Sequence, residues 1–210
     1  TPIKLSIDRL KNKTSKGINI SETEVIDTMN TINRQVDDIK NLVDEFSNFA
    51  RMPAPNMQKY NIKDIIVNAI SLFDLKSNKI VIDLDKKSLD HFVKCDESQI
   101  NRVLNNLIIN SIHSIESKYN NESGGTIYID ASLKDNYLKI KIFDNGKGLS
   151  HKEEDLLKPY FSTKEKNIGT GLGLSIVEKI ISEHGGNFHI YNLEDKSGAC
   201  SEFTLRLFND

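Results

Sequence analysis

The feature that most constrains the fold is a heptad stripe in the first quarter of the chain. Its apolar residues follow one another in alternating steps of four and three: Val25, Met29, Ile32, Val36, Ile39, Val43 and Phe46. This 3.5-residue period turns one narrow seam toward a partner helix, whereas a helix packed on a globular core usually carries a wider stripe. The alternative is an ordinary amphipathic helix that lies on a neighbouring domain.

Sequence signals also set the ends of this helix. Ser21 and Glu24 have the spacing of a capping box, which predicts a start near Ser21, and the closely spaced Pro53 and Pro55 predict its end. Residues 3–10 continue a similar stripe over a short stretch, and the polar residues 11–20 predict a connecting loop. Because such a hairpin cannot bury its seam alone, we expect two copies to form a dimeric four-helix bundle.

We therefore predict a truncated helical hairpin over residues 1–54 and a separate domain over residues 55–210. Within the second domain, apolar periodicity predicts helices at 62–73, 98–117 and 171–184, and strands at 79–84, 126–133, 137–143, 187–191 and 202–208. A long polar stretch at 145–169 separates two of these elements. Helices combined with an apparently antiparallel sheet predict an α+β two-layer sandwich.

Composition narrows the class of protein. Of 210 residues, 38% are hydrophobic and 28% are charged, and the net charge of −2 predicts no nucleic-acid partner. No apolar run approaches the roughly 18 residues of a membrane span, so we expect no membrane contact from this stretch. The chain begins without Met inside a helical pattern, and we interpret it as part of a longer protein. Cys95 and Cys200 stand singly, which fits a reducing cytosol.

The predicted helix at 98–117 has an unusual polar side. Arg102, Asn106, Asn110 and His113 line the side opposite its apolar face. Asparagine is a poor helix former, so two asparagines one turn apart suggest a ligand. An Asn side-chain oxygen could coordinate Mg²⁺, a hard cation that prefers oxygen. For this helix alone, a solvated polar face explains the pattern equally well.

A first glycine-rich segment, Asp144-Asn145-Gly146-Lys147-Gly148-Leu149, follows an alternating strand. A carboxylate at the end of a strand can accept a hydrogen bond from an exocyclic amine, and the glycines let the backbone pass close to a flat base. The alternative is a plain turn, because Asp-Asn-Gly is also a common hairpin signal.

A second glycine-rich segment, Gly169-Thr170-Gly171-Leu172-Gly173-Leu174-Ser175, opens a predicted helix. Backbone N–H groups and the helix dipole favour an anion there, so the segment predicts phosphate binding. It matches neither the Rossmann fingerprint nor a Walker A loop, and the alternative is a flexible linker. The long stretch between the two segments is either a functional lid or a disordered segment; as a lid, it would be anchored by Phe161, and Lys164 could reach a phosphate.

Taken in order, Asn-x-x-x-Asn, DNGKGL, PYFSTK and GTGLGLS resemble the N, G1, F and G2 boxes of sensor histidine kinases, over residues 56–210. The resemblance implies the Bergerat ATP-binding sandwich, with Asn110 as the Mg²⁺ ligand and Asp144 as the adenine anchor. It implies that Asn106 and His113 contact phosphate or metal. The full set of ATP-binding residues that it implies is Asn106, Asn110, His113, Asp144, Gly146, Gly148, Lys164, Gly169, Thr170, Gly171, Leu172, Gly173 and Leu174.

Residues 1–10 resemble the segment that follows His-Glu-x-x-Asn-Pro-Leu in the NtrY-like nitrogen-regulation group of these kinases. The first predicted helix contains no histidine, so the phosphoacceptor and its neighbouring acid are absent and we assign no catalytic residue. The resemblance further implies a homodimer formed through the hairpin and a cognate response regulator as partner. It also implies the cytoplasmic portion of an inner-membrane-anchored bacterial sensor kinase.

The residue at position 106 separates two kinds of ATP chemistry. In gyrase, heat-shock and mismatch-repair ATPases of the same fold, a Glu one turn before the Mg²⁺-binding Asn activates water. Asn106 is neutral here and cannot take a proton, so we predict phosphoryl transfer to a histidine with slow hydrolysis. A nucleotide-binding module without catalysis stays open as an alternative. Anti-sigma-factor serine kinases share the fold but lack such a heptad hairpin.

Overall fold

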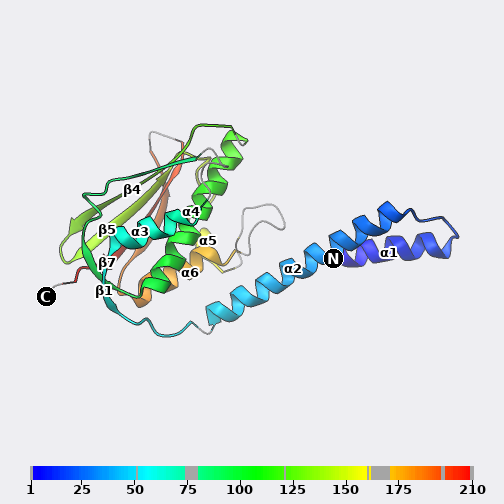
Figure 1. Ribbon diagram of the computed structural model, residues 1–210, viewed down its shortest axis with the longest axis horizontal. Helices are drawn as coiled ribbons and strands as arrows, with labels where there is room; N and C mark the ends of the chain where they lie inside the picture. Colours follow the sequence, from blue (N-terminus) through cyan, green and yellow to red (C-terminus); the bar gives the residue numbers. More distant parts are fainter. Residues whose placement is uncertain are drawn as a thin grey trace. The chain divides into compact units, whose positions relative to one another are not determined.

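A computed structural model describes residues 2–50, 52–73, 80–120, 122–159, 161, 171–194 and 197–208. The chain divides into two compact units, Thr1–Met52 and Pro53–Asp210 (Figure 1). The first unit is helical, and the second combines helices with a sheet.

The first unit is a hairpin of α1 (Pro2–Ser15) and α2 (Glu22–Ala50). The Glu24 backbone N–H donates to Ser21 Oγ at 3.2 Å, so the predicted cap begins α2. The Glu24 carboxylate accepts from Lys13 Nζ at 2.6 and 2.8 Å. The prediction of a loop from residue 11 was wrong, because α1 continues to Ser15 and its last turn binds α2 through Lys13.

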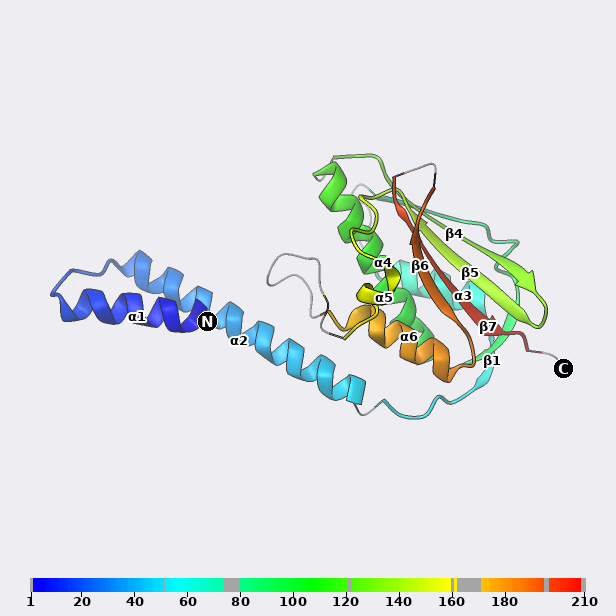
Figure 2. The same cartoon turned by 180° about the vertical axis from the view of Figure 1, so that it is seen from behind.

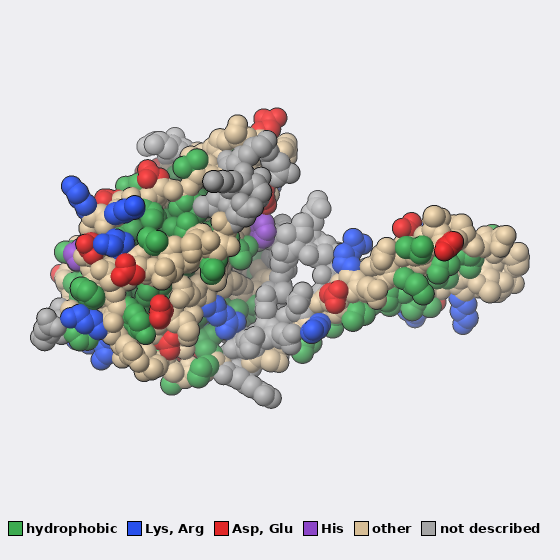
Figure 3. Space-filling model, in the orientation of Figure 1, with side chains coloured by type: hydrophobic (Ala, Val, Ile, Leu, Met, Phe, Trp, Pro, Cys, Tyr) green, Lys and Arg blue, Asp and Glu red, His purple; other side chains and the backbone are tan. Residues whose placement is uncertain are grey.

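The heptad seam of α2 lies open within a single chain. Met29, Val36, Ile39 and Val43 are each more than half exposed. Val25 and Ile32 are half-buried, and the side chain of Phe46 lies outside the described residues. Figure 3 shows hydrophobic side chains gathered along this hairpin. Among the helices that the structure describes, none is long and apolar enough to cross a membrane.

The second unit is built on a five-stranded sheet of order β2-β4-β5-β7-β6. Its strands are β2 (Ile80–Leu84), β4 (Gly125–Lys134), β5 (Tyr137–Asp144), β6 (Phe188–Asn192) and β7 (Ala199–Arg206). The expectation of an antiparallel sheet was wrong for one pair, because β2 runs parallel to β4. The other three pairs are antiparallel.

Three short elements were not predicted. β1 (Gln58–Asn61) and β3 (Phe92–Cys95) pair antiparallel as a separate two-stranded sheet. A one-turn helix, α5 (Glu153–Leu156), interrupts the stretch that was expected to be without regular structure. Each element spans four residues, which is too short for a periodic pattern to be recognised.

Helices α3 (Ile62–Ser71), α4 (Glu97–Tyr119) and α6 (Gly173–Glu183) form a layer on one face of the sheet (Figures 1 and 2). Successive residues of a strand point to opposite faces, so β5 turns Leu138, Ile140 and Ile142 toward these helices. The facing side of α4 buries Ile100, Val103, Leu104, Leu107, Ile108, Ile112 and Ile115. The predicted two-layer α+β sandwich is confirmed.

Candidate functional site

The candidate site starts from the last residue of the central strand β5. Strand alternation gives Asp144 the same inward direction as Leu138, Ile140 and Ile142, so a carboxylate stands where a core aliphatic side chain is expected. Asp144 is 8% exposed. A buried carboxylate requires hydrogen-bond donors around it.

Those donors come from the backbone that follows β5 and from α4. The Gly146 N–H donates to Asp144 Oδ1 at 2.9 Å. Ser114 Oγ lies 3.4 Å from Oδ1, and Ser111 Oγ lies 3.4 Å from Oδ2. Burial raises the pKa of Asp144 above its usual value, and hydrogen bonds from Gly146, Ala199, Ser114 and Ser111 partly offset this rise. The contacts with the two hydroxyls are long, so the carboxylate keeps capacity to accept from another donor.

The segment after Asp144 lies directly on α4. A Cβ added to Gly146 would strike the side chain and backbone of Ser114, so only glycine allows this approach. Gly148 has φ +82°, the left-handed region that favours glycine. The side chain of Asn192 holds the following residue, because its Oδ1 accepts from the Leu149 N–H and its Nδ2 donates to the Leu149 carbonyl.

Asn145 fastens the same segment to the end of α4. Its Oδ1 accepts from the Thr126 N–H at 2.9 Å, and its Nδ2 donates to Tyr119 Oη at 3.1 Å and to the Gly124 carbonyl at 2.9 Å. Lys118 Nζ donates to the Asn145 carbonyl at 2.6 Å. These bonds hold the backbone beside Asp144 in one conformation.

The polar side of α4 carries the predicted asparagines. Arg102, Asn106, Asn110 and His113 are all half-buried. Asn106 Nδ2 donates to the Arg102 carbonyl at 2.8 Å, so its Oδ1 is the atom turned outward from the helix. A Cβ added to Gly173 would come within 2.8 Å of this Oδ1. The start of α6 therefore lies against Asn106.

The glycine-rich segment before α6 is described only from Gly171 onward, and Lys164, Gly169 and Thr170 lie outside the described residues. Gly171 has φ +71°, and Leu172, which follows it, is fully buried. Helix α6 begins at Gly173, and its N-cap residue Leu172 makes no side-chain capping bond. The first-turn N–H groups of such a helix form a site for an anion.

Helix α4 joins the two halves of the site. Ser111 and Ser114 contact Asp144, and Asn106 contacts Gly173. From residue 106 to residue 114 the helix rises about 12 Å. Asp144 and the start of α6 are thus held at two fixed heights along one rigid helix, with Asn110 between them. This spacing suits a ligand with a flat polar end and an anionic end.

The two serines were not among the predicted site residues. Ser111 is a small polar residue within the buried face of α4, and this is the one sequence signal that could have indicated it. Their partner, Asp144, is 33 and 30 residues away along the chain, so their contact with it depends on how α4 packs on β5.

The two cysteines, Cys95 and Cys200, are both buried. Burial raises the pKa of Cys95 to about 12 and that of Cys200 to about 11, so both remain thiols at neutral pH. In the part of the chain that the structure describes, no group of three or more His, Cys, Asp and Glu side chains is placed to hold a metal ion.

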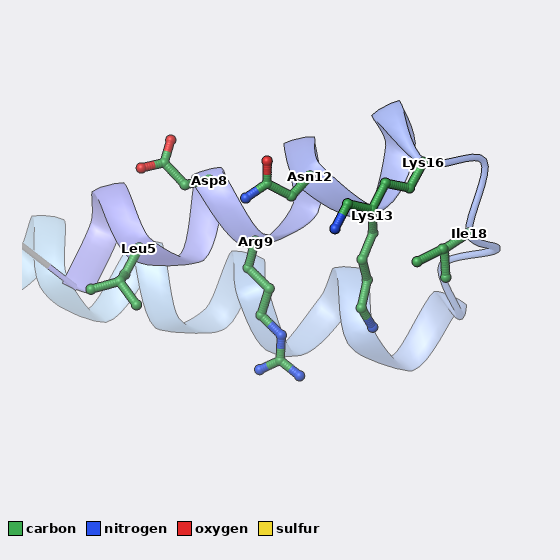
Figure 4. Close-up of a pocket in the computed structure, with 7 residues that line it drawn as sticks. All are labelled: Leu5, Asp8, Arg9, Asn12, Lys13, Lys16 and Ile18. Carbon is green, nitrogen blue, oxygen red and sulfur yellow. The ribbon is translucent and has the colours of Figure 1, made fainter.

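A groove of about 390 Å³ lies in the helical hairpin, not at the site around Asp144. It is lined by Leu5, Asp8, Arg9, Asn12, Lys13, Lys16 and Ile18. Figure 4 shows Arg9 and Lys13 extending toward α2, while Asp8 points away from it. Lys13 and Arg9 both lie within ion-pair distance of Glu24, at 2.6 and 3.6 Å, so part of the basic charge is neutralised within the hairpin.

The sequence matches known proteins over nearly its whole length. A family model described as histidine kinase-, DNA gyrase B-, and HSP90-like ATPase matches residues 95–209. The nitrogen regulation protein NtrY of Azorhizobium caulinodans is 37% identical over 98% of this chain and 27% of its own length. A putative NtrY-like sensor histidine kinase of Rickettsia typhi is 36% identical over 93% of this chain and 32% of its own length. The chain spans less than a third of either relative.

Solved structures share the fold. The catalytic domain of histidine kinase ThkA aligns with a TM-score of 0.60 at 28% identity, covering 72% of this chain and 96% of that chain. ThkA in complex with response regulator protein TrrA aligns with a TM-score of 0.72 over 99% of this chain and 58% of that chain. At 23% identity, this second similarity concerns the fold alone.

Proposed function

The chain belongs to the histidine kinase-, DNA gyrase B- and HSP90-like ATPases, as an NtrY-like sensor histidine kinase, and from this premise we propose that its second unit binds Mg²⁺-ATP for phosphoryl transfer. The γ-phosphoryl group would pass to a histidine and then to an aspartate of a response regulator. The observation that carries this proposal is the pair of contacts on α4, with Asp144 at Ser111 and Ser114 and with Gly173 at Asn106.

Asp144 is the adenine anchor in this proposal. Its buried carboxylate has acceptor capacity left after the Gly146 bond, which suits the exocyclic amine of adenine. Gly146 lets the backbone after Asp144 lie directly on Ser114 of α4, which fixes the carboxylate that would bind the base. Gly148 keeps the next turn compact.

The phosphates would lie at the start of α6. Gly171, Leu172, Gly173 and Leu174 form the backbone that leads into α6, and the dipole at this helix N-terminus favours negative charge. Lys164, Gly169 and Thr170 are assigned to the same group by resemblance. Their contribution would be charge neutralisation and enclosure of the phosphates.

Mg²⁺ would be bound by Asn110 together with phosphate oxygens and water, the kind of mixed coordination that this cation prefers. Asn106 and His113 flank Asn110 by one turn and would contact phosphate or metal. Because Asn106 is neutral, it cannot deprotonate water, which supports transfer over hydrolysis. Catalysis would rest on positioning and charge neutralisation.

The acceptor histidine would belong to the longer protein, because the described α1 contains none. We infer that the hairpin associates with a second copy through the exposed seam of α2 and that the response regulator is of the nitrogen-regulation kind. We also infer that the chain is the cytoplasmic part of an inner-membrane-anchored sensor. The absence of histidine from α1 favours one other function for this chain by itself, a nucleotide-binding module that performs no transfer.

The test mixes this chain, labelled ATP and a longer chain that includes the upstream histidine. We expect acid-labile label on the longer chain. The longer chain carries Asp144→Asn, which weakens its own pocket, and ATP is kept at a concentration that fills mainly the unaltered pocket of this chain. Tight ATP binding without transfer would favour the module. Rapid ATP hydrolysis without phosphohistidine would contradict the kinase.

A further inference from the structure

Asp96 holds two parts of the second unit at once. Its Oδ1 accepts from the Gln99 N–H at 3.1 Å and from Ser98 Oγ at 2.7 Å, which caps α4. Its Oδ2 accepts from the Asn56 N–H at 2.9 Å. Burial raises the pKa of Asp96, but hydrogen bonds from Asn56, Ser98 and Gln99 outweigh it and keep the pKa below its usual value. The charged carboxylate therefore binds the segment that enters the unit to the start of α4.

His184 connects the same point to the end of α6. Its Nε2 accepts from the Asp96 N–H at 3.0 Å, and its Nδ1 lies 2.8 Å from the Ile180 carbonyl. The amide can only donate and the carbonyl can only accept, so the ring is neutral with its proton on Nδ1. His184 is 5% exposed. The imidazole therefore braces the C-terminal end of α6 against the residue that precedes α4.

Gln99 adds a second hold on the incoming segment. Its Nε2 donates to the Pro53 carbonyl at 3.0 Å, and its Oε1 is buried without a hydrogen-bond partner in the described part of the chain. Because the Pro53 carbonyl can only accept, the orientation of the amide is fixed. Gln99 therefore holds the incoming segment at Pro53, while Asp96 holds it at Asn56.

The brace and the phosphate end of the site are opposite ends of one antiparallel helix pair. His184 meets Asp96 at one end, and Gly173 meets Asn106 at the other. The helical rise gives about 15 Å from residue 96 to residue 106 and about 17 Å from residue 173 to residue 184. The two spans match, so a shift of α6 along α4 at the brace moves Gly173 relative to Asn106 by a similar amount.

We propose that Asp96 and His184 form a clamp that couples attachment of the incoming segment at Asn56 to nucleotide affinity, by fixing α6 along α4. This inference rests on the proposed function. Both are positioning residues, because they act on the pocket through the helices and not by contact with the nucleotide. Linkage requires reciprocity: if release of the clamp lowers the affinity for nucleotide by some factor, bound nucleotide favours the closed clamp by the same factor.

The clamp also sets the length of free chain between the two units. When it is closed, the second unit holds the chain from Pro53 onward. When Asp96 releases Asn56 and Gln99 also releases Pro53, the next fixed element is β1, which begins at Gln58. The five residues released extend the reach of the tether by about 17 Å. Nucleotide binding would therefore shorten the tether, and its loss would lengthen it.

The test measures hydrogen exchange of the Asn56 amide and the affinity for a non-hydrolysable ATP analogue with Mg²⁺. Asp96→Ser keeps one oxygen to cap α4 and removes the oxygen that binds Asn56. We expect the Asn56 amide to exchange about tenfold faster in Asp96→Ser, as for the loss of one charge-assisted hydrogen bond. We expect affinity for the analogue to fall about fivefold, and the analogue to slow Asn56 exchange in the unaltered chain by the same factor.

Two further variants isolate the clamp. Asn56→Pro removes the donor N–H and leaves Asp96 and α4 intact, and it should lower affinity as Asp96→Ser does. Glu97→Gln removes a neighbouring charge outside the clamp and should change neither measurement. Unchanged affinity in both clamp variants would overturn the coupling. A chain that binds no nucleotide would contradict the proposed function. In that case the exchange measurement still tests the clamp. Slower exchange of the Asn56 amide in the unaltered chain than in Asp96→Ser would support the clamp, and equal exchange in the two chains would overturn it.

Discussion

Helices α2 and α4 both carry a long apolar face, but only α4 finds a partner for that face within its own chain. The seam of α2 leaves Met29, Val36, Ile39 and Val43 exposed, whereas the face of α4 is buried against the sheet. The sequence already distinguishes the two helices, because a 3.5-residue stripe suits another helix and a wider stripe suits a core. The difference teaches that the apolar face of α4 is satisfied by folding, whereas the seam of α2 stays exposed in a single chain.

The largest expected effect compares one isoleucine on each helix. Ile108 on α4 is fully buried and Ile39 on α2 is 56% exposed. Ile108→Ala should lower the free energy of unfolding of the second unit by about 2–5 kcal/mol, because it removes buried methyl groups and leaves a cavity. Ile39→Ala should lower the free energy of unfolding of the first unit by less than about 0.5 kcal/mol. Calorimetry at a concentration where the chain is monomeric measures both variants. Equal losses in the two variants would contradict the conclusion that only the face of α4 is buried within a single chain.

The next effect appears when chains associate. Ile39→Glu places a charge in the seam of both copies and should raise the dimer dissociation constant about 100-fold, since a charge is costly in an apolar interface. Asn30→Glu, an exposed position on the side away from the seam, is the matched control and should leave the constant nearly unchanged. Light scattering over a concentration series measures both. A chain that stays monomeric at high concentration would exclude the bundle.

Much of this architecture follows from local sequence signals. The alternation in β5 predicted both the strand and the position of Asp144 at its end, and the apolar spacing in α4 predicted that helix. Polar composition misled at residues 11–15, because Lys13 keeps the chain helical by binding Glu24 across the hairpin. That bond joins residues on two different helices, so the helix propensity of either segment alone does not indicate it.

Contacts between distant segments explain what the sequence did not predict. β1 and β3 are four residues each and depend on one another, and the parallel pairing of β2 with β4 joins segments separated by all of α4. At the candidate site, the contact of Ser111 and Ser114 with Asp144 and the approach of Gly173 to Asn106 arise only when helices and sheet pack together. The roles of the site residues in binding nucleotide stay predictions.

A mutation on the polar side of α4 would test whether this helix is also completed by a ligand. Asn110→Ala should remove the Mg²⁺-dependent part of ATP affinity, about 30-fold, which is the size of one hydrogen bond or ligand contact to a charged group. Because Asn110 is half-buried and outside the apolar face, the melting temperature should change little. Affinity measured with and without Mg²⁺ checks the metal assignment, and an unchanged ratio of the two affinities would contradict it.

The smallest expected effect concerns the charge of Asp144. Burial raises the pKa of this carboxyl, so the folded state holds its proton more tightly than the unfolded state. The stability that results is fully present below the unfolded pKa and is lost as pH rises through the folded pKa. Asp144→Asn should remove that loss, so unfolding of the second unit should depend less on pH just above the unfolded pKa, while affinity for ATP falls about tenfold. If Asp144→Asn unfolds with the same pH dependence as the unaltered chain, burial of the charged Asp144 carboxylate does not destabilise the second unit.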